Sequence, residues 1–165
     1  MKEIESLLKQ LVYVHNRTHS FFQQIQESPF GIEALYWRMP FGKGRAHMGW
    51  QFMHLAATYH KFAYYCNPSL YLDQKFIEEF GHGSIPNEKK VISISEIWDK
   101  LDLEFKKFYG CYENFPEEKL DEKPVPEINR THRENIYLML WHEASHLGQC
   151  QITWNSFRAM KEIIS

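Results

Sequence analysis

Four long segments of the chain repeat apolar residues at the spacing of an α-helix, and this periodicity constrains the fold more than any other feature. The segments cover approximately residues 2–27, 46–66, 94–114 and 131 onwards. Helices of this kind bury their apolar faces by packing against one another. The 165 residues are enough for one hydrophobic core, so we expect a single domain over residues 1–165.

Local signals mark where these helices begin and end. Two proline-containing dipeptides follow the first two helices, Ser28-Pro29 and Asn67-Pro68. The last two helices each begin with a capping box, in which a Ser or Thr and a Glu three residues later satisfy each other's backbone N–H groups. The two boxes are Ser93 with Glu96 and Thr131 with Glu134.

The connections between the helices differ in length and composition. Residues 29–45, "PFGIEALYWRMPFGKGR", contain two prolines and three glycines, which predicts an irregular connection. Residues 67–92 are too many for a bare loop, and "SLYLDQKFIEEFGHGS" predicts a short extra helix ending at Gly81 or Gly83. Only "KKVISI" alternates like a strand, and it has no partner. The prediction is an all-α, antiparallel-type four-helix bundle with a long connection between its second and third helices.

Charge and composition argue against several classes of function. The formal net charge is -2, with 19 basic and 21 acidic residues spread along the chain, so no basic surface for nucleic acid or anionic lipid is expected. The first residues, "MKEIESLLKQ", carry charges where a secretory signal needs an apolar run, and no stretch approaches the roughly 20 apolar residues of a membrane span. We expect a cytoplasmic protein. The widely spaced Cys66, Cys111 and Cys150 are expected to be buried, reduced thiols.

The stretch "LMLWHEASHLGQCQITW" contains a His-Glu-x-x-His pattern in the last helix. At 100° per residue, His142 and His146 lie about 40° apart and one turn above each other, so both can bind one metal ion. The same face carries mostly core-type side chains, namely Leu138, Met139, Gln149, Thr153 and Phe157. We therefore expect both imidazoles to point into the bundle and to be metal ligands.

A third ligand is expected from the second helix, "HMGWQFMHLAATYHKF". His54, about midway along its inward face, is the preferred candidate, and His47 near the helix start is the reserve. The remaining histidines are expected at the surface or at helix ends: His15, His19, His60, His82 and His132. His60 is turned about 120° away from His54. His15 and His19 repeat the i, i+4 spacing but have no matching partners for a second metal site.

The His-Glu-x-x-His pattern also occurs in zinc proteases, but the rest of the chain does not fit that class. Such enzymes need a third ligand downstream; the sixth residue after His146 is Ile152, and Glu162 lies at the end of the same helix. The predicted fold also has no edge strand to align a peptide. Glu143, the base in such proteases, is turned about 100° from His142. A structural role for Glu143 is preferred, with a place at the pocket rim or a contact that supports a metal ligand left open.

Two motifs in this order resemble the DinB/YfiT-like superfamily of four-helix-bundle metalloproteins. The first is W-x-x-x-H-L, whose histidine is His54, and the second is H-E-x-x-H-x-G-Q, which begins at His142. The resemblance implies a metal site formed by His54, His142 and His146. It also implies a choice of activities, since the characterised members include thiol S-transferases, thiol-dependent isomerases and related hydrolases, while others have no assigned activity.

Three neutral imidazoles leave a divalent cation its full charge and at least one open coordination position. Such a centre lowers the pKa of bound water or of a bound thiol, so hydrolysis and thiol transfer both fit it. All-nitrogen ligation suits zinc, nickel or ferrous iron. We expect a thiol S-transferase that joins bacillithiol, or a related low-molecular-weight thiol, to a small electrophile. A metal-dependent hydrolase and a non-catalytic metal-binding stress-response protein are the alternatives, and no catalytic residue is identified.

The surroundings of the motif give further expectations. Trp50 is placed to wall the pocket, Gln149 to hydrogen-bond within the bundle, and Gly148 to permit close helix packing. The last helix also has a second apolar stripe, formed by Ile136, Leu140, Leu147 and Trp154. This stripe is expected to contact either a second copy of the chain, giving the homodimer common in the resembling family, or residues 67–92 of the same chain.

Overall fold

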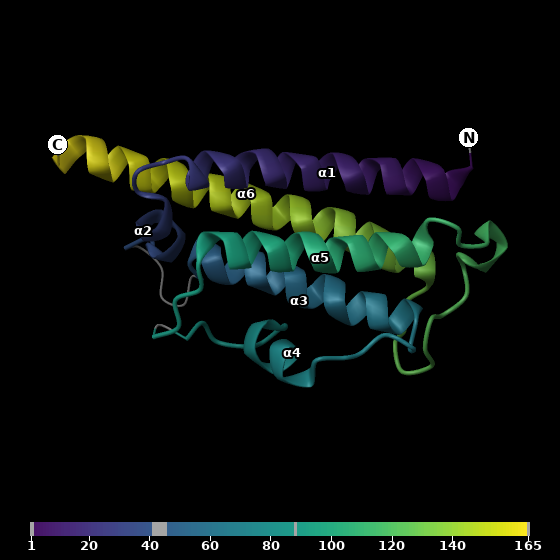
Figure 1. The fold of residues 1–165 in the computed structure, drawn as a ribbon. Helices are drawn as coiled ribbons and strands as arrows, with labels where there is room; N and C mark the ends of the chain where they lie inside the picture. Colours follow the sequence, from purple (N-terminus) through teal and green to yellow (C-terminus); the bar gives the residue numbers. More distant parts are fainter. Residues whose placement is uncertain (1, 41–45, 88, 165) are drawn as a thin grey trace.

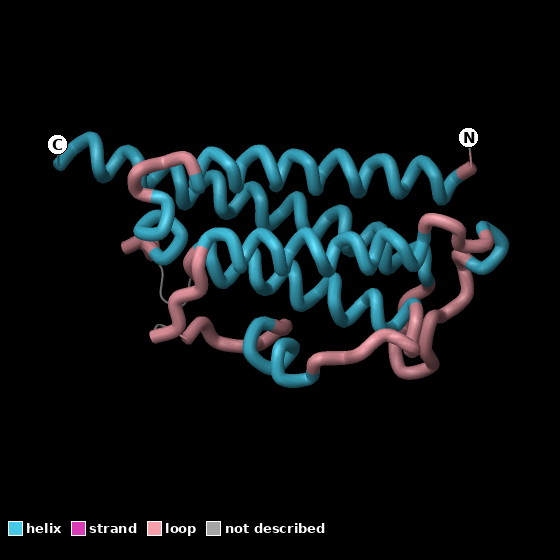
Figure 2. Tube along the Cα trace, in the orientation of Figure 1, coloured by secondary structure: helices cyan, strands magenta, loops and turns pink. Residues whose placement is uncertain are grey.

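The computed structural model describes residues 2–40, 46–87 and 89–164, and within these ranges it is helical, without a strand (Figures 1 and 2). The four long helices are α1 (Glu3–Gln26), α3 (Met48–Cys66), α5 (Ile94–Tyr112) and α6 (His132–Ile164). Their bounds lie within two residues of the predicted ones, and the all-α prediction is confirmed. None of the helices in the described ranges combines the length and the apolar character that a membrane span requires.

Both predicted capping boxes are present. The Ser93 hydroxyl accepts a hydrogen bond from the backbone N–H of Glu96, and the Glu96 carboxylate accepts one from the Ser93 backbone N–H at 3.1 Å. In the second box, the Thr131 backbone N–H donates to Glu134 at 2.8 Å and the Thr131 hydroxyl accepts from the Glu134 backbone N–H at 3.2 Å. These bonds satisfy N–H groups that a helix start otherwise leaves unpaired, which is why α5 and α6 begin where the sequence predicts.

The four long helices form a ring in which each packs against two neighbours: α1 contacts α5 and α6, and α3 contacts the same two helices. Figure 1 shows that α3 and α5 run in one direction and that α1 and α6 run in the other. The bundle therefore combines parallel and antiparallel pairs, which corrects the expected antiparallel type. The long connection causes this arrangement, because it carries the chain back along the bundle before α5 begins.

That connection contains α4 (Gln74–Phe80), which ends at Gly81 as predicted. Its first turn is capped by Asp73, whose carboxylate accepts a hydrogen bond from the Phe76 N–H at 3.0 Å. In Figure 1, α4 lies alongside α3, and the two helices are in contact. The connection thus places the end of α4 near the middle of α3.

A further short helix, α2 (Gly31–Tyr36), lies in the segment for which the sequence predicts an irregular connection. Ala34 and Leu35 are fully buried, so packing against α1 and α3 stabilises a helix too short to form alone. The last part of the predicted irregular stretch, residues 41–45, lies outside the described residues.

The second apolar stripe of α6 is buried within the chain. The exposed fractions of Ile136, Leu147 and Trp154 are 0%, 9% and 7%, and Leu140 is partly buried. Because α6 packs against α3 with its histidine face, the stripe is covered on the side of α1. The prediction that it meets a second copy or residues 67–92 is therefore wrong.

Candidate metal centre

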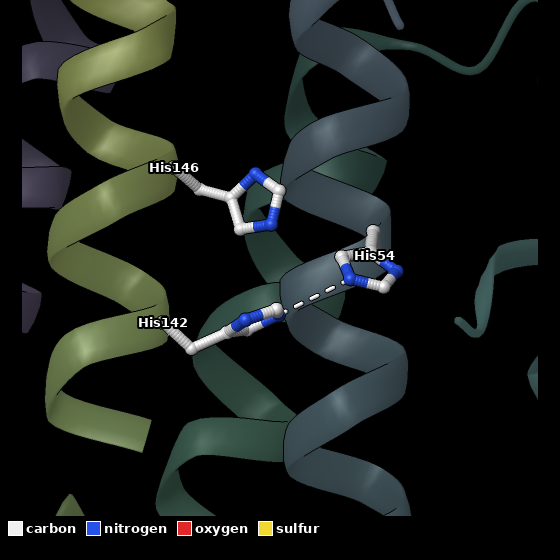
Figure 3. A group of neighbouring side chains, drawn as sticks. All are labelled: His54, His142 and His146. Atoms are coloured by element: carbon white, nitrogen blue, oxygen red, sulfur yellow. Dashed lines mark hydrogen bonds between the residues drawn. The ribbon is translucent and has the colours of Figure 1, made fainter. Parts of the chain in front are cut away.

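Three histidines from two helices meet between α3 and α6. His54 comes from the middle of α3, and His142 and His146 lie one turn apart on α6 (Figure 3). Each offers a nitrogen atom, and these atoms all lie within 4.8 Å of one another. The Nε2 atoms of His54 and His142 are 3.1 Å apart. Among the residues that the structure describes, this is the one cluster of at least three His, Cys, Asp or Glu side chains with such geometry.

Hydrogen bonds at Nδ1 orient two of the three rings. The Nδ1 of His54 lies 2.6 Å from the backbone carbonyl oxygen of Phe80, the last residue of α4. The Nδ1 of His146 lies 3.1 Å from Oε1 of Gln51. Both oxygens can only accept, so each Nδ1 carries the proton and each Nε2 keeps its lone pair. A lone pair on Nε2, supported by a hydrogen bond at Nδ1, is the usual state of a metal-binding histidine.

The short distance between the two Nε2 atoms fits a shared cation. Nitrogens bound to a tetrahedral zinc ion at about 2.05 Å would be about 3.3 Å apart, close to the separation observed for His54 and His142. Two imidazole lone pairs repel at this distance unless a proton or a cation lies between them. The three-histidine cluster could therefore hold a divalent metal ion.

Burial keeps the imidazoles of this cluster neutral. Burial, with a smaller contribution from the neighbouring imidazoles that disfavour a second positive charge, lowers the pKa of His142 to about 4 and the pKa of His146 to about 3. Burial also lowers the pKa of His54, although the hydrogen bond to the Phe80 carbonyl opposes this effect. Near pH 7 the three rings therefore offer lone pairs without first releasing a proton.

A pocket of about 490 Å³ lies beside His146, within the range of small-molecule sites. Its lining consists of Met39, Ala46, Trp50, Gln51, His146, Gln149, Ile152 and Thr153. Within the described part of the chain this lining contains no Asp, Glu, Lys or Arg. Trp50 stacks on the His54 ring, with centroids 4.8 Å apart and planes 9° apart, so it walls the pocket as predicted.

Glu143 points away from the three histidines. Its carboxylate is fully buried and accepts hydrogen bonds from the Nδ1 of His15 at 3.0 Å and from the Tyr59 hydroxyl. His15 belongs to α1 and Tyr59 to α3, so the carboxylate joins three helices. This contact agrees with a structural role for Glu143 and not with the role of a protease base. The expected surface position of His15 is wrong, since its side chain is buried.

His60 and His132 are also buried, which corrects a surface position for both. His60 lies 2.9 Å from the Glu104 carboxylate through Nδ1, and its Nε2 accepts a hydrogen bond from the Asp73 N–H at 2.8 Å. His132 stands at the start of α6, as the helix-end prediction allows, and contacts the Tyr112 hydroxyl at 3.1 Å. These two imidazoles hold parts of the bundle together and are not part of the three-histidine cluster.

The other predicted histidines also lie outside the cluster. The reserve ligand His47 caps α3, where its Nδ1 accepts a hydrogen bond from the Trp50 backbone N–H at 3.0 Å. His19 stacks on Trp98, and His82 is exposed. Neither His19 nor His15 forms a second metal site with the described residues.

The residues around the motif differ in part from expectation. A side-chain Cβ added to Gly148 would meet no atom within 4 Å, so the predicted close packing at this glycine is wrong. Gln149 is exposed and lines the pocket. The contact of Gln51 with His146 is not predicted from the sequence, although Gln51 precedes His54 by one helical turn. That spacing is the signal that identifies Gln51 as a neighbour of the site.

The three cysteines are free thiols, as predicted, but only Cys150 is buried. Cys66 and Cys111 are partly exposed, which corrects the expectation for these two. They lie at the ends of α3 and α5.

Comparison with known proteins adds one finding. The family model described as the DinB superfamily matches residues 10–150, a span that includes all three clustered histidines. No curated protein and no solved structure matches the chain.

Proposed function

The chain belongs to the DinB superfamily, and from that premise we propose that it is a metal-dependent enzyme that transfers a low-molecular-weight thiol, bacillithiol or a relative, to a small electrophile. The observation that carries the proposal is the meeting of three imidazoles at the edge of a small-molecule pocket. A closed site of four protein ligands would serve structure alone, whereas three ligands leave room for a reacting group.

In this proposal His54, His142 and His146 hold the metal ion, which when bound supplies a Lewis acid that favours the deprotonated form of a thiol. Gln51 and the Phe80 carbonyl keep the protons of two rings on Nδ1 and so keep the ligand atoms available. The set of three nitrogen ligands suits zinc, nickel or ferrous iron, since all three metals accept imidazole nitrogen.

The pocket residues bind and orient the electrophile. Met39, Trp50 and Ile152 offer apolar surface, and Thr153 and Gln149 offer hydrogen-bonding groups. The indole N–H of Trp50 is buried and has no hydrogen-bond partner among the described residues. An uncharged lining favours an uncharged electrophile, such as an epoxide or an alkyl halide, whose carbon is attacked by the thiolate sulfur while its C–O or C–halogen bond breaks.

Hydrolysis is the weaker candidate because of where the carboxylates lie. Activation of water in metallohydrolases of the His-Glu-x-x-His kind relies on the motif glutamate as a base. Here Glu143 is engaged with His15 and Tyr59 away from the pocket, and the described pocket lining contains no carboxylate. A thiol is far more acidic than water and needs less help to ionise, so the site favours thiol transfer.

The test uses metal-stripped protein to which zinc, nickel or ferrous iron is returned. Each form is assayed with an epoxide or alkyl halide in the presence and absence of bacillithiol and other cellular thiols. We expect conjugation that requires both metal and thiol. Metal-dependent turnover without thiol would indicate a hydrolase, and metal binding without turnover of any pair would indicate a binding protein, so either result would overturn the proposal.

The homodimer is retained as a proposal on a different face of α6. Tyr137, Trp141 and Ile152 are 49%, 65% and 59% exposed and lie within about 60° of one another around the helix. An exposed apolar stripe of this kind is typical of an interaction surface. Light scattering after size exclusion should give twice the chain mass of 19.8 kDa, and Trp141→Glu should give a monomer. A monomeric wild-type protein throughout the micromolar range would contradict the dimer.

A further inference from the structure

Two cysteines lie side by side where α3 and α5 end. Cys66 is the last residue of α3, and Cys111 lies in the last turn of α5, which runs parallel to α3 (Figure 1). The Cys66 sulfur is 3.8 Å from the carbonyl oxygen of Cys111, and the Cys111 sulfur is 3.7 Å from the carbonyl oxygen of Ala63, one turn before Cys66. The two thiols are also close enough for each to shift the pKa of the other. Both side chains are partly exposed, so small solutes can reach them.

The pair is surrounded by groups that can move a proton. The Tyr112 hydroxyl interacts with the Cys66 thiol and lies 3.1 Å from Nδ1 of His132. Burial lowers the pKa of His132, so its imidazole is neutral near pH 7 and can accept a proton. The interaction between the two thiols lowers the pKa of Cys111 and raises the pKa of Cys66. Cys111 is therefore the thiol of the pair that ionises first.

We propose that Cys66 and Cys111 form a reversible intramolecular disulfide and that a peroxide is the oxidant. In the first step the Cys111 thiolate attacks a peroxide oxygen: an S–O bond forms, the O–O bond breaks, and the other oxygen takes a proton and leaves as water or an alcohol. In the second step the Cys66 sulfur attacks the Cys111 sulfur: the S–S bond forms, the S–O bond breaks, and hydroxide leaves as water with the proton from Cys66. Two thiols lose two electrons in total, and one peroxide gains them.

The position of the disulfide suggests what it controls. It would join residues 45 positions apart and so close a loop that contains α4. The last residue of α4, Phe80, orients His54 through its carbonyl oxygen. Cys66 lies 12 residues beyond His54 on α3, about 18 Å along the helix, so the cysteine pair does not share atoms with the three-histidine cluster. Oxidation therefore restricts the segment that supports His54 and does not consume a metal ligand.

Cys150 provides an internal control. It is fully buried on α6, and burial raises the pKa of its thiol, so it should react slowly with peroxide. The three cysteines thus divide into a reactive pair and one inert thiol, and the number of thiols that remain free after oxidation can be counted.

The full-length protein is treated with one equivalent of hydrogen peroxide at pH 7, unfolded, alkylated and analysed by mass spectrometry. We expect the number of alkylated cysteines to fall from three to one, with a linked peptide pair that contains Cys66 and Cys111. Dithiothreitol should restore all three, and the oxidised protein should melt at a higher temperature. Cys150→Ser should form the same disulfide. In Cys66→Ser, Cys111 should instead accumulate sulfenic acid that dimedone traps.

Three results would overturn the proposal. One is a wild-type protein that keeps three alkylatable cysteines under these conditions. Another is a disulfide that includes Cys150 or that forms only between chains. The third is a Cys66→Ser variant in which Cys111 reacts with peroxide no faster than Cys150 does. None of these readouts depends on the bound metal or on thiol transfer.

Discussion

Removal of one hydroxyl group tests how Glu143 acts. In Tyr59→Phe the ring keeps its contacts with Phe105 and Phe108, but the hydrogen bond to the Glu143 carboxylate is lost. Tyr59 and Glu143 are both fully buried, so water does not replace the missing donor. A hydrogen bond to a charged group stabilises a protein by about 1.5–3 kcal/mol. We expect the free energy of unfolding to fall by about 2 kcal/mol, which corresponds to a melting temperature about 4–8 °C lower for a domain of this size.

The assay is urea unfolding followed by far-ultraviolet circular dichroism, on metal-free and metal-loaded protein. Tyr13→Phe is the matched control, because Tyr13 is 67% exposed on α1 and its change should shift the free energy by less than about 0.5 kcal/mol. Metal affinity should be equal in Tyr59→Phe and wild type, since the Glu143 side of α6 faces away from the ligand nitrogens.

Two outcomes would refute this reasoning. A Tyr59→Phe protein as stable as the wild type would mean that the carboxylate does not hold the helices together. A variant of normal stability that has lost metal-dependent turnover would instead place Glu143 in the reacting centre, as in the proteases.

Three further changes give separate tests. Gln51→Leu removes the acceptor at Nδ1 of His146 and should weaken metal affinity about 10–100-fold in a competition titration; unchanged affinity would show that the amide does not orient the ring. Burial alone would raise the pKa of Glu104, but hydrogen bonds from His60, Lys100 and Lys107 outweigh it and lower the pKa to about 2. This carboxylate should therefore add about 3 kcal/mol to the free energy of unfolding at pH values above its usual pKa of 4.5, and this contribution should be lost as the pH falls toward 2. Glu104→Gln should make the free energy of unfolding depend less on pH in that window. An equally steep pH dependence in the variant would contradict the assignment. Gly148→Ala should raise stability by up to about 1 kcal/mol, because a methyl group there meets no atom within 4 Å, and a lower melting temperature would disprove it.

The long helices follow from the sequence because their signals are local. Apolar periodicity and the capping boxes at Ser93 and Thr131 depend only on neighbouring residues, and they locate α5 and α6 closely. Which helices pair, and in which relative direction, is harder to predict from the sequence. The parallel run of α3 and α5 depends on the path of the connection, and α2 depends on the burial of Ala34 and Leu35 against other helices.

The candidate site divides in the same way. His54, His142 and His146 can be grouped from helical spacing, and the structure brings them together. The partners that orient them cannot be found so directly, since the Phe80 carbonyl belongs to the backbone of a separate helix. The burial of His15 is equally hard to predict from the sequence, because its partner carboxylate, that of Glu143, lies 128 residues away.

X-ray absorption spectroscopy tests the metal centre most directly. Protein loaded with one equivalent of zinc should bind it tightly. The extended fine structure above the zinc absorption edge should show nitrogen neighbours at about 2.0–2.1 Å with the outer-shell scattering of three imidazole rings. His54→Ala should lose one of these rings from the spectrum. Sulfur neighbours, or a wild-type spectrum that His54→Ala leaves unchanged, would contradict the three-histidine site.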